Sequence, residues 1–244
     1  MIRAMSTSSA PGPLAGRVAL VSGANRGIGL AVVRGIAERG ATVFLGARDL
    51  AAGEAAAAAL RADGHVVHAL ELDVTDRASI TAAVASIDAA HGRLDVLVNN
   101  AGILTYDNAV DFDPDTAELF WKINTLGPWL LAAAAVPLMR RNGWGRIVNV
   151  STEMASFTRM TASAPSYRVS KTALNAVTRV LALELDGSGI LVNAVSPGWV
   201  RTAMGGSAAP RSIEQGCASI LWGVDVPDGG PNGEFFQDGA ALPW

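Results

Sequence analysis

Short apolar runs alternate with longer helical segments along this chain, and that alternation restricts its possible folds more than any other feature. We expect strands at residues 17–22, 42–47, 66–72, 94–99, 145–151 and 190–196, with a short seventh at 233–237. Strands that are apolar throughout need cover on both faces, which is typical of parallel sheets. Because crossovers between parallel strands are right-handed, the pattern predicts an α/β fold: a doubly wound parallel sheet of about seven strands with helices on both faces.

The segments between these strands have helical patterns and contain no linker. We expect helices at residues 28–39, 50–62, 76–91, 114–141 and 165–185. Gly127 and Pro128 lie within the longest of them and should bend or divide it. The uninterrupted alternation predicts a single domain over residues 14–244, preceded by a flexible tail at residues 1–13 that contains Ser, Pro and Gly.

The composition argues against several classes of function. Hydrophobic residues make up 50% of the chain and charged residues 17%, which suits a large buried core. The net charge is −3 and no stretch is basic, so we expect no nucleic-acid partner. The longest apolar run, residues 129–139, is too short to cross a bilayer, and the three histidines lack metal-ligand spacing. With one cysteine, Cys217, and no signal-like apolar segment near the start, we expect a cytoplasmic protein without a membrane partner or a metal.

A glycine-rich turn lies between the first predicted strand and the first predicted helix. Its glycines are Gly23, Gly27 and Gly29. Glycines at this place let the backbone turn sharply and approach a pyrophosphate, which the helix N-terminus attracts. The turn therefore indicates a dinucleotide site in a Rossmann fold, although its spacing is G-x-x-x-G-x-G rather than G-x-G-x-x-G.

The residues after the second strand bear on the choice of cofactor. An NAD site would place an acid there, roughly 20 residues beyond the glycines, to bind the ribose 2′-hydroxyl. Here Ala47 stands at that place and Arg48 follows, while Arg26 lies in the glycine-rich turn. Two guanidinium groups suit a 2′-phosphate, which favours NADP(H). Asp49 is a nearby acid that argues for NAD, unless it caps the next helix.

Tyr167 and Lys171 are four residues apart in a predicted helix and so lie on one face of it. A nearby ammonium group stabilises a phenolate and makes the tyrosine a usable acid/base. The Y-x-x-x-K pattern alone is a weak signal. Downstream of a dinucleotide site it indicates hydride-transfer chemistry.

In order along the chain, these motifs resemble the short-chain dehydrogenase/reductase superfamily from about Leu14 to the C-terminus. The resemblance rests on SGANRGIG at 22–29, DV at 73–74, NNAG at 99–102, Asn124, NVS at 149–151, YRVSK at 167–171 and PGWVRT at 197–202. The sequence looks most like the carbonyl-reductase branch, whose members favour NADPH.

The resemblance implies a cofactor site made by six segments. Asp73 and Val74 would lie along the adenine, and the segment after the sixth strand would border the nicotinamide. The residues assigned to the cofactor are Gly23, Asn25, Arg26, Gly27, Ile28, Gly29, Arg48, Asp73, Val74, Asn100, Ala101, Gly102, Tyr167, Lys171, Pro197, Gly198, Val200 and Thr202.

The resemblance also implies the catalytic roles. Tyr167 would donate a proton to a carbonyl, and Lys171 would bind the nicotinamide ribose and lower the tyrosine pKa. Asn124 would hold a water that joins Lys171 to solvent. The family normally has a serine, often the second of an NVSS run, that binds the substrate carbonyl. Here the run is NVST, so either Thr152 or Ser151 would serve.

Together these features predict an NADPH-dependent carbonyl reductase that also works in reverse as an alcohol dehydrogenase. An NAD-linked alcohol dehydrogenase and a non-catalytic dinucleotide sensor are the alternatives, and a sensor would not need the Tyr167–Lys171 pair. The substrate would be a small aldehyde or ketone. Met154, Phe157, Met160 and Trp199 either line its pocket or only pack. The resemblance implies a homo-oligomer, a dimer or tetramer, formed through the long helices that begin near residues 115 and 165.

Overall fold

A computed structural model describes residues 12–244 of the chain; residues 1–11, most of the predicted tail, lie outside the described residues. Its centre is a single sheet of eight strands in the order β3-β2-β1-β4-β5-β6-β7-β8. The strands are β1 (Val18–Ser22), β2 (Thr42–Ala47), β3 (Val67–Glu71), β4 (Val96–Asn99), β5 (Gly145–Val150), β6 (Ile190–Val195), β7 (Phe235–Gln237) and β8 (Ala240–Ala241).

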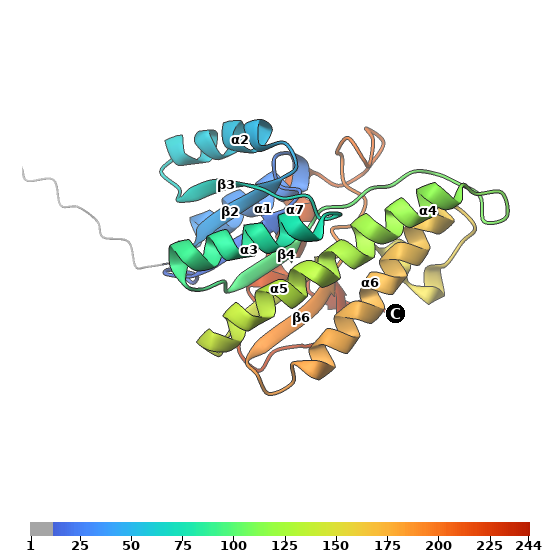
Figure 1. The fold of residues 1–244 in the computed structure, drawn as a ribbon. Helices are drawn as coiled ribbons and strands as arrows, with labels where there is room; N and C mark the ends of the chain where they lie inside the picture. Colours follow the sequence, from blue (N-terminus) through green and yellow to red (C-terminus); the bar gives the residue numbers. More distant parts are fainter. Residues whose placement is uncertain (1–11) are drawn as a thin grey trace, which may run out of the picture.

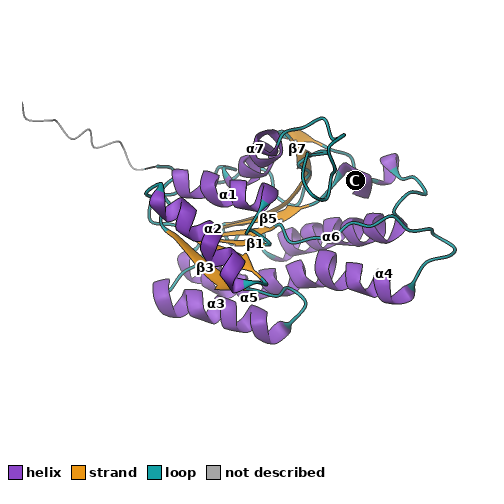
Figure 2. Cartoon of the chain, turned by 90° about the horizontal axis from the view of Figure 1, so that it is seen from above, coloured by secondary structure: helices purple, strands orange, loops and turns teal. Residues whose placement is uncertain are grey.

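Helices cover both faces of the sheet in three layers (Figures 1 and 2). One face carries α1 (Gly27–Glu38), α2 (Leu50–Ala62) and α7 (Ile213–Val224). The other carries α3 (Arg77–His91), α4 (Pro114–Trp121), α5 (Gly127–Asn142) and α6 (Pro165–Glu184). Each face has its own apolar core, because the strands between them are buried on both sides.

The predicted doubly wound parallel sheet is confirmed, with one strand more than expected. Strands β1 to β7 pair in parallel, whereas β8 adds an antiparallel edge. A two-residue strand of alanines gives no periodic signal, so the sequence did not reveal it. Helix α7 was also not predicted, although Ser212 and Gln215 form a capping box at its start that signals a helix N-terminus.

The long helix is divided near the expected place. Five residues, Lys122–Leu126, form a π-helical turn between α4 and α5. Taken together, Pro114–Asn142 is long and apolar enough to span a membrane by length and composition. However, 56% of its most apolar window is buried within the fold, as in a core helix, and it packs against α3 and α6.

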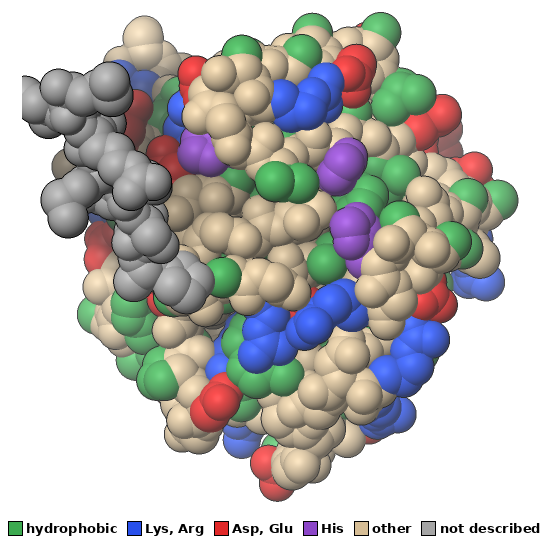
Figure 3. Space-filling view, turned by 90° about the vertical axis from the view of Figure 1, so that its left-hand side faces the viewer, with side chains coloured by type: hydrophobic (Ala, Val, Ile, Leu, Met, Phe, Trp, Pro, Cys, Tyr) green, Lys and Arg blue, Asp and Glu red, His purple; other side chains and the backbone are tan. Residues whose placement is uncertain are grey.

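The three histidines gather at the outer edge of the sheet, away from the centre (Figure 3). His68 and His91 lie against Phe44, with ring centroids 5.3 and 5.5 Å from its own. Within residues 12–244 no cluster of three or more His, Cys, Asp or Glu side chains could hold a metal. Cys217 is buried in α7, and burial raises its thiol pKa to about 11, which suits a packing role.

Candidate active site

Four of the sequence motifs, those at 22–29, 99–102, 149–151 and 197–202, lie at the carboxyl ends of parallel strands and therefore meet at one edge of the sheet. The chain reverses its winding direction between β1 and β4, which are neighbours in the sheet. Such a switch point opens a crevice where open α/β sheets bind their ligands. The glycine-rich turn follows β1, Asn100 follows β4, and the Ser151–Thr152 pair follows β5.

The turn after β1 is shaped by close packing against the segment after β4. Gly23 has a φ of +62°, and a Cβ there would lie 2.8 Å from the Cα of Ala101. The Asn100 Nδ2 group donates to the carbonyls of Ser22 and Gly23, each at 2.9 Å. A Cβ on Gly29 would lie 2.5 Å from that Nδ2. Asn100 and Ala101 therefore pack against the glycine-rich turn and fix its shape.

The N-terminus of α1 has backbone N–H groups without a side-chain cap. Arg26 occupies the N-cap position in an extended conformation, and its side chain makes no capping bond. By contrast, aspartates cap α2, α3 and α4 and a serine caps α7. Gly27, with a φ of +58°, faces the Thr202 methyl group, which a Cβ would approach to 3.9 Å. These features suit a pyrophosphate between the turn and the segment after β6.

The adenine end of this groove contains two exposed cations. Neither Arg26 nor Arg48 forms an ion pair among residues 12–244. Asp49, the acid that argued for NAD, accepts a bond from the Ala52 N–H at 3.0 Å and caps α2. One oxygen of Asp73 binds the Thr75 backbone and hydroxyl, which fixes its carboxylate at the groove.

Tyr167 and Lys171 lie in the first two turns of α6, both buried. The Thr152 side chain lies close enough to the Tyr167 hydroxyl to lower its pKa. The Lys171 ammonium donates to the Val150 carbonyl at 2.7 Å. A Cβ on Gly102 would lie 3.5 Å from Lys171 Nζ, so the lysine also borders the segment after β4. The structure thus brings the predicted pair to the end of β5 and to the cofactor groove.

The two hydroxyls at the end of β5 point to different partners. Thr152 Oγ1 accepts from the Met154 N–H at 3.2 Å and faces Tyr167. Ser151 is buried, and its hydroxyl donates to Asn175 Oδ1 at 2.6 Å. Of these two candidates, Thr152 therefore has its hydroxyl beside Tyr167, whereas the Ser151 hydroxyl is hydrogen-bonded to helix α6.

Burial is the largest influence on the pKa values of Tyr167 and Lys171. It raises the pKa of Tyr167 to about 12, against a smaller lowering by the Thr152 bond. Burial also lowers the pKa of Lys171 to about 8. In the protein alone, desolvation outweighs the Thr152 contact on Tyr167, and the lowering of the tyrosine pKa by Lys171 stays a prediction.

Asn124 lies in the π-helical turn and its side chain is fully buried. Its amide forms two bonds with the Ile103 backbone, accepting from the N–H at 2.9 Å and donating to the carbonyl at 3.1 Å. It also donates to the Ser170 hydroxyl, which in turn donates to the Tyr167 carbonyl. The side chain is thus occupied in joining the segment after β4 to α6.

Pro128 follows four residues after Asn124 and has no N–H, so the α-helical bond to the Asn124 carbonyl cannot form. This break coincides with the π-helical turn, in which Gly127 donates to the Lys122 carbonyl five residues earlier. The water contact of Asn124 stays a prediction.

The chain is similar in sequence and in structure to known proteins. The family model of short chain dehydrogenases matches residues 17–212. The chain belongs to the short-chain dehydrogenase/reductase family. This oxidoreductase is 35% identical to carbonyl reductase (NADPH) 1 of Sus scrofa, with 93% of this chain and 94% of the relative covered. It is 37% identical to the oxidoreductase UcpA of Salmonella typhimurium, with 86% and 79% covered.

Among solved structures, the dehydrogenase is similar to the NADPH-bound carbonyl reductase from chicken fatty liver. The TM-score is 0.86 at 30% identity, and 96% of each chain is covered. The predicted resemblance to the carbonyl-reductase branch is confirmed. Family and groove together support a dinucleotide cofactor and a small-molecule substrate.

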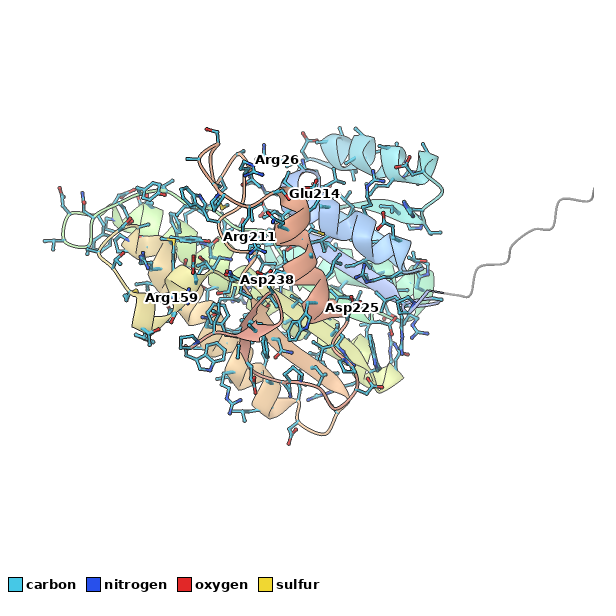
Figure 4. All side chains as sticks on the ribbon, turned by 180° about the vertical axis from the view of Figure 1, so that it is seen from behind. Arg26, Arg159, Arg211, Glu214, Asp225 and Asp238 are labelled. Carbon is cyan, nitrogen blue, oxygen red and sulfur yellow. The ribbon has the colours of Figure 1, made fainter. Side chains whose placement is uncertain are left out.

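Two features of this short-chain dehydrogenase were missed in the sequence. The segment after β6 is closed at its base by a bridge between Val200 and Arg211, and Arg211 pairs with Asp238 through both terminal nitrogens (Figure 4). A Cβ on Gly198 would lie 2.5 Å from the Arg211 side chain. Arg211 therefore fixes the Pro197–Gly198 turn, but an arginine in a loop gives no sequence signal of such a pairing.

Apolar residues border Tyr167 as the sequence suggested for some of them. Met154 packs in a cluster with Phe120, Ala164 and Tyr167. Phe157 and Trp199 are more than half exposed. Phe157 also borders a hollow of about 660 Å³ on the far side of α6, near Trp244. Because neither Tyr167 nor Lys171 lines that hollow, we assign the reaction to the crevice at the strand ends.

Proposed function

We propose that this protein is an NADPH-dependent reductase of aldehydes and ketones, which also oxidises the matching alcohols. The observation that carries the proposal is the proximity of the Thr152 hydroxyl, at the end of β5, to the buried Tyr167, whose pKa it lowers. Two hydroxyls that meet beside an apolar cluster can hold one carbonyl oxygen between them. The buried Lys171 lies in the same helix, one turn further on.

In the proposed reaction, the Thr152 hydroxyl binds the substrate oxygen and Tyr167 gives it a proton. The raised pKa of Tyr167 keeps the phenol protonated, as a proton donor must be. The cofactor supplies the hydride and, when oxidised, a positive charge. Lys171, held by the Val150 carbonyl, would bind the cofactor ribose and stabilise the phenolate that proton transfer leaves.

The proton would be replaced through the π-helical turn. The Asn124 carbonyl would bind a water, while its amide fixes the neighbouring backbone at Ile103. Lys171 and a chain of waters would then carry a proton from solvent to Tyr167. The buried amide contributes by positioning, since its donors are taken up by protein groups.

The choice of NADPH rests on the two exposed guanidinium groups of Arg26 and Arg48. Asp49 is engaged as the cap of α2, so it is less suited to hold a ribose hydroxyl. The carbonyl reductase of Sus scrofa and the chicken structure are both named for NADPH, which supports the same choice. A guanidinium group forms paired, charge-assisted hydrogen bonds with a phosphate such as the 2′-phosphate of NADPH. The 2′-hydroxyl of NADH cannot form such bonds.

The test compares wild-type protein with Tyr167→Phe and Arg48→Asp, using NADPH consumption with a panel of activated ketones. Tyr167→Phe should lower turnover at least ~100-fold, the lower range for a lost general acid, with NADPH affinity nearly unchanged. Arg48→Asp should erase or reverse the preference for NADPH over NADH while Tyr167-dependent turnover remains. A Tyr167→Phe variant that keeps more than half of the wild-type rate would contradict the mechanism. Equal affinities of the wild type for NADPH and NADH would contradict the cofactor choice.

A further inference from the structure

Arg168, the residue after the catalytic tyrosine, is a buried arginine whose bonds all go to one neighbouring segment. Its side chain is in the first turn of α6 and is only 6% exposed as a residue. Its Nε donates to the Ser163 carbonyl at 2.6 Å, and its Nη1 donates to the carbonyls of Met154 at 2.9 Å and Arg159 at 3.2 Å. Among the described residues, no carboxylate pairs with it.

The segment that Arg168 binds is the connection between β5 and α6, residues 152–164. Its three acceptors come from the first 3₁₀ turn, the second 3₁₀ turn and the end of the connection. The connection enters α6 through Ala164, which has a left-handed φ of +51° that a non-glycine residue adopts only under constraint. One guanidinium group thus fastens the beginning, the middle and the end of the segment to the helix that carries Tyr167.

The same segment carries the residues that surround the reacting groups. Thr152 begins it, and Met154 packs against Tyr167 within the apolar cluster. Backbone bonds within the two 3₁₀ turns shape the segment locally. Side-chain bonds tie it to α6: Arg168 binds the Met154 carbonyl, and the Thr172 hydroxyl donates to the Ala155 carbonyl at 3.0 Å. Arg168 is the one of these two ties that also reaches the middle and the end of the segment.

The chemistry of this contact favours arginine over any other residue. A buried cation is costly unless it is hydrogen-bonded, and here three carbonyl oxygens accept from Nε and Nη1 without a neutralising acid. The planar guanidinium presents several donors in fixed directions, whereas a lysine ammonium is a single point of contact. Arg179, on the same helix, is exposed and meets one carbonyl only, that of Gly233 at 3.3 Å.

We propose that Arg168 is a positioning residue that holds the 152–164 segment in the shape that selects the substrate. The inference rests on the proposed function, because selection applies only if the site reduces carbonyl compounds. Arg168 touches neither of the reacting hydroxyls through its side chain and acts through Met154, Arg159 and Ser163. Loss of its bonds should loosen the wall and let bulky ketones compete better with small ones.

The first experiment measures selectivity. Arg168→Met keeps an apolar stem and removes the donors, Arg168→Lys keeps the charge, and Arg179→Met is the matched control on the same helix. For each, kcat/KM is measured with a small and a bulky ketone, together with the Kd for NADPH. Arg168→Met should change the ratio of the two kcat/KM values by at least about fivefold through KM, with an unchanged Kd for NADPH. Arg168→Lys should restore part of the ratio. An unchanged ratio in Arg168→Met overturns the proposal.

A second measurement does not depend on activity. The carbonyl that Arg168 holds at Arg159 belongs to the peptide bond that trypsin cleaves, and Arg159 lies at the outer end of the molecule (Figure 4). Cleavage between Arg159 and Met160, followed by mass spectrometry, should be about tenfold faster in Arg168→Met than in wild type or Arg179→Met. Equal rates of cleavage in Arg168→Met and in wild type would overturn the proposal that Arg168 holds the 152–164 segment. If the wild type reduces no ketone, the proposed function fails while this comparison still decides whether Arg168 holds the segment. If Arg168→Met does not fold, Arg168→Lys serves in both comparisons.

Discussion

At position 152 a threonine stands where the resemblance leads one to expect serine, and the neighbouring Ser151 offers a second hydroxyl. The structure turns Ser151 toward Asn175 and sets Thr152 against Tyr167. The added methyl of threonine restricts the side chain to fewer rotamers but leaves the donor and acceptor in place. The Thr152 hydroxyl is therefore fixed more firmly than a serine hydroxyl would be.

Thr152→Ala should lower turnover roughly 100-fold or more, because a lost donor to a developing oxyanion costs about 3–4 kcal/mol. Thr152→Ser keeps the hydroxyl and should stay within about tenfold of wild type. Ser151→Ala should be the milder of the two alanine changes, since it removes a bond to α6 only. Steady-state kinetics on the three variants check this. An inactive Ser151→Ala beside an active Thr152→Ala would give the role to Ser151.

The pH dependence of reduction should report Lys171. Its pKa, lowered to about 8 by burial, leaves the side chain charged below that pH and neutral above it. Tyr167, with a pKa raised to about 12, stays protonated across the same range. The kcat/KM for reduction should therefore be highest below about pH 8 and fall as the pH rises through it.

Lys171→Arg provides the control, because arginine remains charged throughout this range. Whatever activity that variant retains should decline only at higher pH than in the wild type. A wild-type profile that stays flat into the alkaline range would show that the charge on Lys171 is not needed.

Among the elements, the π-helical turn between α4 and α5 has the most direct consequence for the site. It buries Asn124 beside α6, and Pro128 cannot donate the α-helical bond to the Asn124 carbonyl. Pro128→Ala would supply an N–H at that position. We expect it to lower turnover by about tenfold with little change in NADPH affinity, if the carbonyl binds the relay water. Ala132→Ser, one turn further along α5, is the control for a change in the same helix. Pro128→Ala with wild-type turnover would remove this carbonyl from the relay.

The sequence predicted the elements that repeat a strong pattern. The six main strands and the helices around them carry apolar runs long enough to see, and the caps at Asp49 and Asp76 mark their helix starts. The π turn could not be predicted, since Gly127 and Pro128 signal a break but not its geometry. Helix α7 was not predicted, although the capping box of Ser212 and Gln215 marks its start.

For the site, sequence alone located the residues but not their partners. Tyr167 and Lys171 were expected to interact, yet burial governs both, and the lysine binds the Val150 carbonyl. Whether Ser151 or Thr152 faces the tyrosine depends on a strand end and on one hydroxyl rotation. Contacts such as Arg211 with Asp238 join loops that are remote in sequence, so no local pattern records them.

For the whole molecule, the exposed face of α4, α5 and α6 is the surface most suited to self-association. These helices lie side by side (Figure 1) and expose the large apolar residues Leu119, Trp121, Trp129, Val169, Val180 and Leu183. Large exposed apolar side chains on neighbouring helices are typical of an interface. We propose that copies of the chain associate through it.

Val180→Glu should weaken this association, because it places a charge in an apolar contact. Val66→Glu is a matched control: Val66 is 54% exposed and Val180 55%, but Val66 lies just before β3 at the other end of the sheet. Sedimentation velocity should show an oligomer for the wild type and Val66→Glu and a shift toward monomer for Val180→Glu. A monomeric wild type would contradict the proposal.

Helix α7, the last helix in the chain, packs against α1, the first. Leu221 fills the space above Gly35, and Val148 and Val195 of β5 and β6 lie beneath Gly223. During synthesis the ribosome releases α1 and these strands well before residue 224, so the nascent chain carries an uncovered apolar face until α7 emerges. Any chain that stops before Ile213 keeps that face open and becomes a substrate for chaperones or for aggregation, even though Thr152, Tyr167 and Lys171 are already present.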